Sequence, residues 1–85
     1  MNKSDLNIAE LRIAVQAALN GDWQGSHNIA QKYGDATANW LHAALHKIEG
    51  DESNSRYWYA RTSGRHYEEF VDTTEELRAI LSQIT

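Results

Sequence analysis

The chain has 85 residues, with no cysteine, no proline and a formal net charge of −4 at pH 7. This length predicts one domain, residues 1–85, whose small core depends on a few large side chains. Because cysteine is absent, a disulfide framework and thiolate chemistry are excluded, which favours the cytoplasm. The acidic balance argues against nucleic acid as a partner.

No part of the sequence predicts a membrane partner. The first ten residues lack the apolar segment of a signal peptide. No stretch approaches the roughly 18 apolar residues that a membrane-spanning helix requires. A soluble protein is therefore expected.

Glycines divide the chain into five predicted helices. A Gly-Asp pair occurs three times, at 21–22, 34–35 and 50–51. Glycine fits the left-handed position just past a helix end, and the aspartate then caps the next helix. Thr73 and Glu76 have the spacing of a capping box, and Gly64 is a natural stop. The predicted helices cover about 5–20, 22–33, 35–49, 51–63 and a last segment that starts near 73.

The apolar residues recur at helical spacing and predict the core. The predicted core consists of Trp23, Trp40, Leu41, Leu45, Ile48, Trp58, Leu77 and Leu81. The first helix is apolar on two sides, formed by Ile8, Leu11, Val15, Ala18 and Leu19 and by Leu6, Ile13 and Ala17. If the last helix folds back over the second side, the protein is a monomer, which is the expected state. A weak homodimer across that side is the alternative.

The order helix, Gly-Asp, helix, Gly occurs twice along the chain. The pairs 21–22 and 50–51 are 29 positions apart, and Gly34 and Gly64 are 30 apart. This period is close to that of helical-hairpin repeats, although such arrays usually have three units or more. The predicted fold is all-α, with two helical hairpins and a C-terminal capping helix.

The segment 21–65 contains a pattern of the form W-x-x-x-H, followed by W-x-H-A-x-L-H-x-x-E-G-D-x-x-N-x-x-Y-W-Y-x-R-x-x-G. The residues that carry it are Trp23, His27, Trp40, His42, Ala43, Leu45, His46, Glu49, Gly50, Asp51, Asn54, Tyr57, Trp58, Tyr59, Arg61 and Gly64. This pattern resembles that of a small family of uncharacterised bacterial proteins. The resemblance covers about half of the chain and implies no activity.

The segment 49–64, EGDESNSRYWYARTSG, is similar to the second half of a tetratricopeptide or Sel-like repeat. Those repeats have a Gly between paired helices and a W-Y in the second helix. They pack closely at an alanine, a position that Ser53 or Ser55 has to fill here. The resemblance implies a helical-hairpin (TPR-like) architecture, and it implies protein binding only by analogy of fold.

Three polar residues of the third predicted helix lie on one side. His42 and His46 are four positions apart, and Glu49 is three beyond His46. Two imidazoles and a carboxylate are able to hold a divalent metal, with His27 of the preceding helix as a fourth ligand. The alternative, which we favour from the sequence, is that the histidines are half-buried neighbours of the apolar stripe, hydrogen-bonded to the backbone or to tyrosine.

Three consecutive aromatic residues occupy the fourth predicted helix. Tyr57, Trp58 and Tyr59 cannot all face the core, because neighbouring helical positions are about 100° apart. We expect Trp58 and one tyrosine to be buried. The other tyrosine either covers a seam or, beside Arg61, anchors an acidic partner. The basic stretch of Arg56, Arg61 and Arg65 and the acidic stretch of Glu68, Glu69, Asp72, Glu75 and Glu76 are expected to compensate each other.

The leading functional hypothesis is a protein- or peptide-binding scaffold module. A groove between the hairpins would be lined by His27, His42, His46, Glu49, Tyr57, Tyr59 and Arg61. The alternative is a metal-binding protein or a small enzyme that uses the same polar cluster. The sequence assigns no catalytic residue, no cofactor and no definite metal site.

Overall fold

Five α-helices and one short 3-10 helix account for most of residues 3–84, the part of the chain that this computed structural model describes, with side chains from residue 7 onward. The elements are α1 (Lys3–Leu19), α2 (Trp23–Ala30), α3 (Ala36–Ile48), α4 (Glu52–Tyr59), the 3-10 helix η1 (Tyr67–Glu69) and α5 (Thr73–Ile84). Residues 3–84 contain no strand. The predicted all-α fold class with five helices is confirmed.

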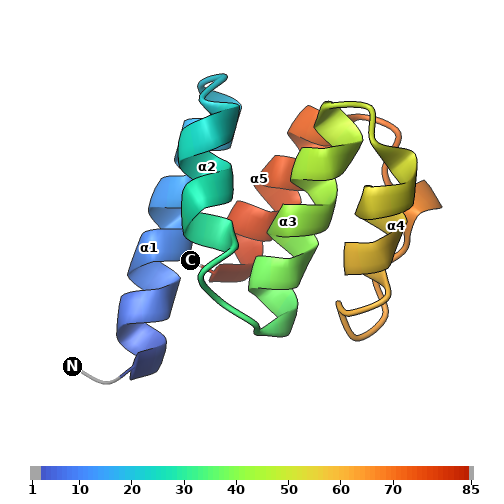
Figure 1. The fold of residues 1–85 in the computed structure, drawn as a ribbon. Helices are drawn as coiled ribbons and strands as arrows, with labels where there is room; N and C mark the ends of the chain where they lie inside the picture. Colours follow the sequence, from blue (N-terminus) through green and yellow to red (C-terminus); the bar gives the residue numbers. More distant parts are fainter. Residues whose placement is uncertain (1–2, 85) are drawn as a thin grey trace.

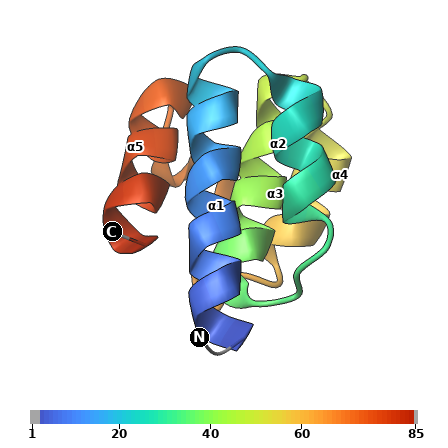
Figure 2. The ribbon, with the colours of Figure 1, turned by 90° about the vertical axis from the view of Figure 1, so that its left-hand side faces the viewer.

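The helices form three layers. Figure 1 shows two antiparallel pairs, α1 with α2 and α3 with α4, standing side by side. In Figure 2, α5 lies on one side of α1 and α3, while α2 and α4 lie on the other side. Because α3 is covered by α5 on one face and by α2 and α4 on the other, every residue from 38 to 46 is buried. Its two faces therefore pack against different helices.

Equivalent turns close the two hairpins. Gly21 and Gly50 both have φ of 85°, in the left-handed region that favours glycine. Asp22 N donates to Ala17 O at 2.8 Å, and Asp51 N donates to His46 O at 2.9 Å. These are the bonds of a Schellman end, and each aspartate side chain then caps the next helix. The 29-residue offset seen in the sequence is thus a repeat of local structure.

The repeat extends to the packing within the hairpins. Ser55 in α4 is fully buried and its hydroxyl donates to Ala43 O at 2.7 Å, so that α4 approaches α3 closely. The small residue at this position is therefore Ser55, and Ser53 is exposed. Ser26, which is 29 residues earlier, is equally buried in α2.

Two predicted helix ends and two predicted joints differ in the structure. The helices α2 and α4 end at Ala30 and Tyr59, earlier than predicted, because the following turns tighten into i→i−3 hydrogen bonds such as Thr62 N to Tyr59 O. Gly34 does not have the positive φ of the other two Gly-Asp turns, although Asp35 does cap α3. At α5 the cap is Asp72, whose Oδ1 accepts from Thr74 N at 2.8 Å, and the predicted capping box with Thr73 does not form.

Glu76 has a different role from the predicted one, because it points into the core. Its carboxylate accepts hydrogen bonds from Trp40 Nε1 at 2.8 Å and from the hydroxyl of Tyr59, and it pairs with Lys47 Nζ at 2.8 Å. Lys47 also donates to the carbonyls of Tyr67 and Phe70. The Glu76 carboxylate and the Lys47 ammonium group are therefore both hydrogen-bonded. Because these bonds join α3 and α4 to η1 and α5, the network holds η1 and α5 against the hairpins.

Most of the predicted core is confirmed. Trp40, Leu41, Leu45 and Leu77 are buried, and Trp23, Trp58 and Leu81 are partly buried against them. Ile48 was wrongly placed in the core: it is 42% exposed, because it is the last residue of α3 at an open turn. No described helix is long and apolar enough to cross a bilayer.

The first helix is less two-sided than its sequence indicates. Leu11 and Val15 are buried as predicted, but Ile8 of the same predicted face is 39% exposed. On the second side Ile13 is 57% exposed, and the side chain of Leu6 lies outside the described residues. Helix α5 packs against α1, but it leaves Ile13 exposed and so does not cover this residue of the second side, as the monomer expectation had assumed it would.

Candidate metal site

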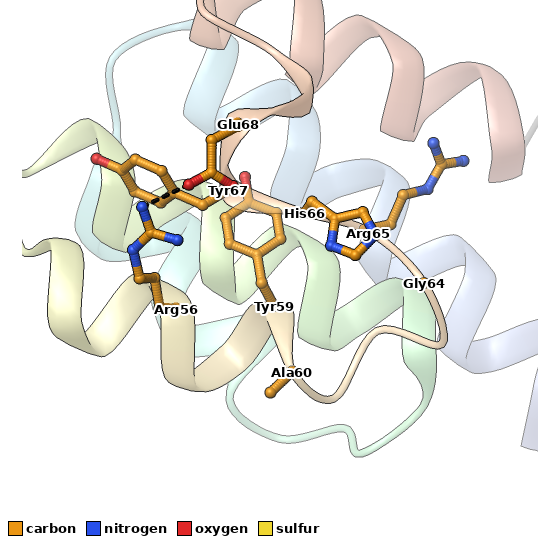
Figure 3. Close-up of a pocket in the computed structure, with 8 residues that line it drawn as sticks. All are labelled: Arg56, Tyr59, Ala60, Gly64, Arg65, His66, Tyr67 and Glu68. Atoms are coloured by element: carbon orange, nitrogen blue, oxygen red, sulfur yellow. Dashed lines mark hydrogen bonds and ion pairs between the residues drawn. The ribbon is translucent and has the colours of Figure 1, made fainter.

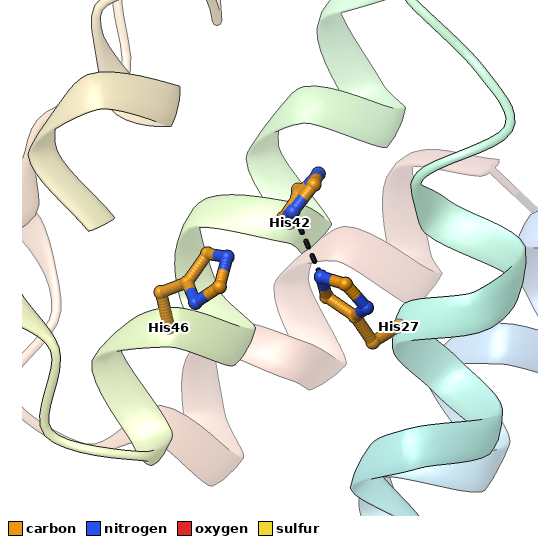
Figure 4. Close-up of side chains that lie close together, drawn as sticks. All are labelled: His27, His42 and His46. Atoms are coloured by element: carbon orange, nitrogen blue, oxygen red, sulfur yellow. Dashed lines mark hydrogen bonds between the residues drawn. The ribbon is translucent and has the colours of Figure 1, made fainter. Parts of the chain in front are cut away.

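Three histidines from two helices meet on the face of α3 that lies between α2 and α4. His42 and His46 are one turn apart on α3, and their rings stack with centroids 4.9 Å apart. His27 reaches across from α2, and its ring centroid lies 4.7 Å from that of His42 and 5.4 Å from that of His46. Figure 4 shows the three rings grouped around one point.

The nitrogen spacing of this cluster suits one shared ion. His27 Nε2 and His42 Nε2 are 3.1 Å apart, and one ligand nitrogen from each of the three rings lies within 4.8 Å of the others. Two nitrogens bound about 2.0–2.1 Å from a tetrahedral Zn²⁺ would themselves be about 3.3 Å apart. The His27–His42 pair is already close to this spacing, at 3.1 Å, and His46 lies within 4.8 Å of both.

Glu49 orients the third ring. Its carboxylate lies 2.6 Å from His46 Nδ1. When that nitrogen carries the proton, the lone pair is on Nε2, and Figure 4 shows the distal ring nitrogen of His46 pointing toward the other two histidines. A carboxylate behind a ligating histidine is the usual outer-shell arrangement of metal sites. Glu49 is thus placed to orient a potential ligand, whereas the sequence had suggested it as a ligand itself.

A second group of potential ligands, His46, Glu49 and Asp51, has a simpler explanation. The Glu49 carboxylate bonds to His46, as described above. The Asp51 side chain accepts from the backbone of Asn54 at 3.3 Å and caps α4. These two carboxylates therefore already have structural partners.

Two tryptophans form the walls of the cluster. The indole of Trp23 stacks on His27 with centroids 4.7 Å apart and an angle of 9° between the planes. The indole of Trp58 stacks on His42 at 4.0 Å and 14°. Trp23 is itself held by a hydrogen bond from its Nε1 to Leu45 O, at 2.7 Å. The rings therefore cannot turn freely away from one another.

The environment keeps two of the imidazoles neutral. Burial, together with repulsion of a positive charge by the neighbouring His27 and His46, lowers the pKa of His42 to about 4. Burial and His46 also lower the pKa of His27, against a smaller opposing effect of Glu49. Near pH 7 both rings therefore present uncharged nitrogens, the form that binds metal.

The other predicted site residues lie elsewhere. Tyr59 is buried in the network of Glu76, on the opposite face of α3 from the histidines. Tyr57 is half exposed, touches Trp58 edge-on and is covered by the guanidinium of Arg61 at 3.7 Å. The structure thus brings together four of the seven predicted residues, namely His27, His42, His46 and Glu49.

A pocket of about 300 Å³ lies between α4 and the loop that follows it, away from the histidines (Figure 3). Arg56 is one of the charged residues that line it, but its guanidinium is already paired with Glu52 and Glu68 and lies over the ring of Tyr67. Arg65 turns away to Glu69 and to the face of Trp40. Arg56 and Arg65 of the basic stretch therefore pair with Glu68 and Glu69 of the acidic stretch, whereas Arg61 lies outside these pairs, and neither arginine of the pocket is free.

The role of the two tryptophans as walls of the cluster was not expected from the sequence, which indicated only core positions for both. Trp23 is four residues before His27, so both lie on one face of α2, and this i, i+4 spacing was a usable signal. The contact of Trp58 with His42 joins different helices, and no local spacing indicates it.

Comparison of the chain with models of protein families, with curated proteins and with solved structures finds no match.

Proposed function

We propose that this protein binds one divalent transition-metal ion through His27, His42 and His46. The observation that carries the proposal is the convergence of three imidazoles, from two helices, with ligand nitrogens within 4.8 Å of one another. Imidazole ligands favour Zn²⁺, Cu²⁺ or Ni²⁺, whereas Mg²⁺ and Ca²⁺ prefer oxygen. Zn²⁺ is therefore the reference ion for the tests below.

A purely structural role explains the cluster less well. Only one hydrogen bond joins the three rings, between His27 and His42. Burying imidazoles side by side lowers the pKa of His42 and so weakens the fold at acidic pH. Apolar side chains would fill the space between the helices without this penalty. The carboxylate of Glu49 behind His46 is the outer-shell arrangement that a metal-bound histidine usually has.

The decisive experiment is calorimetric titration of Zn²⁺ into tag-free, chelator-treated protein, since a polyhistidine tag would bind the same ions. We expect saturation at one ion per chain and a rise in melting temperature with Zn²⁺ concentration. His27→Gln removes a partly exposed ligand. It should weaken Zn²⁺ binding by more than the roughly 10–100-fold typical of losing an outer-shell partner.

The matched control is His66→Gln. His66 is the remaining histidine, exposed in the loop before η1 and outside the cluster. This variant should bind Zn²⁺ like the wild type. Equal Zn²⁺ affinity in the wild type and in a folded His27→Gln variant would overturn the proposal, as would the absence of saturable binding.

A second candidate, the binding of an acidic protein or peptide, is favoured by one observation. Tyr57 is half exposed under Arg61, and Arg61 has no carboxylate partner among the described residues. Tyrosine and arginine are enriched at the energetic centres of interfaces. Affinity capture should then recover a partner with the wild type and lose it with an Arg61→Ala variant, whereas identical recovery with both would count against this candidate.

A further inference from the structure

The three histidines supply fewer ligands than a closed metal site needs. Structural zinc sites are almost always bound by four protein ligands, whereas three protein ligands leave one position for water or another molecule. In the described part of the chain, the group around this centre consists of His27, His42 and His46 alone. Glu49 is behind His46, and Asp51 caps α4.

The walls of the site add no ligand of their own. Trp23 and Trp58 turn their ring faces to His27 and His42, and Trp23 Nε1 is occupied by the carbonyl of Leu45. An indole has no lone pair in its plane to offer a metal. The fourth ligand therefore has to come from outside this group of side chains.

The residues of the cluster differ in how much of each is exposed. His42 and His46 are each 6% exposed, whereas His27, Trp23 and Trp58 are all partly exposed. The accessible side is therefore the one between α2 and α4, where the two indoles stand. A ligand that reaches the histidines from this side has to pass beside the two indoles that stack on His27 and His42, which favours a small ligand over a bulky one.

The charge of the site decides which small ligand is preferred. Histidine ligands bring no negative charge to a divalent ion, and among the described residues the only carboxylate in contact with a ring of the cluster is Glu49, behind His46. In a half-buried position such an ion attracts anions strongly, because the surroundings screen charge less well than water does.

We infer that the bound ion keeps one open coordination position and that this position takes a small monodentate anion in exchange for water. The inference rests on the proposed metal site. It names the ligand class of that site: one negative charge, one donor atom at a time, and a size that fits between Trp23 and Trp58. No protein bond forms or breaks in this exchange.

The test uses tag-free, full-length protein loaded with Co²⁺, whose visible absorption reports its ligands. Azide is the small probe, and benzoate is a bulky anion of the same charge. We expect azide to change the visible spectrum saturably, with one azide for each bound cobalt. Benzoate at the same concentrations should leave the spectrum unchanged. The His66→Gln variant should respond to azide as the wild type does.

The outcomes separate this inference from the proposed function. If Co²⁺ binds at one ion per chain but its spectrum does not respond to azide, the position is closed and the inference is overturned, while the metal site stands. An equal response to azide and benzoate would overturn the size limit. If Co²⁺ does not bind at all, the proposed function fails, and the inference fails with it.

Discussion

At the scale of single residues, the site depends on which nitrogen of each ring carries a proton. His46 has a carboxylate on Nδ1, at 2.6 Å, which leaves its other nitrogen for an ion. His27 and His42 face each other through Nε2 at 3.1 Å. In the absence of metal one of these two donates and the other accepts, and an ion would replace that shared proton.

The first prediction concerns Glu49. Glu49→Ala removes the group that orients His46, so Zn²⁺ affinity should fall by about 10–100-fold while the three ligands remain. Calorimetric titration measures this change, and ¹⁵N chemical shifts of His46 report the loss of a fixed tautomer. Glu52→Ala, at an exposed position on α4, is the matched control and should bind normally. Unchanged affinity in Glu49→Ala would show that His46 needs no such support.

The second prediction concerns pH in the metal-free protein. The pKa of His42 is lowered to about 4 in the folded state from 6.5, so the unfolded chain binds more protons between these values. Stability is fully present above about pH 6.5, declines as pH falls toward 4, and loses no more from this group below that. The largest slope for one group is about 1.4 kcal/mol for each pH unit.

Urea unfolding at a series of pH values, with a chelator present, measures this slope. His42→Gln should flatten it, and His66→Gln should leave it as in the wild type. An identical slope in the wild type and in His42→Gln would mean that other groups cause the acid sensitivity.

At the scale of elements, the two hairpins repeat their turns but differ in one buried hydroxyl. Ser55 Oγ donates to Ala43 O, whereas Ser26 Oγ has no hydrogen-bond partner within the described part of the chain. Both residues are fully buried. A buried hydroxyl without a partner destabilises a fold, whereas a paired one stabilises it modestly.

The third prediction follows from this difference between matched positions. Ser55→Ala should lower the free energy of unfolding by about 1 kcal/mol, because a hydrogen bond between α3 and α4 is lost. Ser26→Ala should leave it unchanged or raise it, because only an unpaired group is removed. Chemical denaturation of both variants measures the two effects. Equal losses would indicate that Ser26 finds a partner in solution.

At the scale of the whole molecule, the two faces of the central helix α3 carry different polar groups. Toward α5 it carries Trp40 and Lys47, which hold the buried carboxylate of Glu76. Toward α2 and α4 it carries His42 and His46. The C-terminal helix thus covers the inner face of the hairpins, and the candidate metal site is on the opposite face.

The fourth prediction concerns association. Because α5 packs against α1, and Ile13 remains 57% exposed, we expect a monomer that tolerates Ile13→Glu without unfolding. Surface substitutions of this kind usually change stability by about 0.5 kcal/mol or less. Sedimentation velocity over a range of concentrations should show one monomeric species for both proteins. A wild-type dimer that Ile13→Glu dissociates would instead identify this side of α1 as an interface.

Local sequence determined the helices and their joints in this protein. Left-handed glycines at 21 and 50 and the aspartates that follow them act within a few residues, so spacing alone reveals the two hairpins. The spacing of His42 and His46 likewise put two potential ligands on one face of one helix. These are short-range properties of the backbone, and they hold before any helix packs against another.

Tertiary structure alone decided which of these faces meet. The approach of His27 to His42 and the stacking of Trp58 on His42 each join residues from different helices. Glu76 of α5 also contacts another helix, because its carboxylate accepts a hydrogen bond from Trp40 of α3. Its spacing from Thr73 had indicated a helix cap instead. Helical periodicity states only that a side chain lies on a certain face of its helix. The rotation and crossing of neighbouring helices, set by the packing of the whole core, determine what that face contacts.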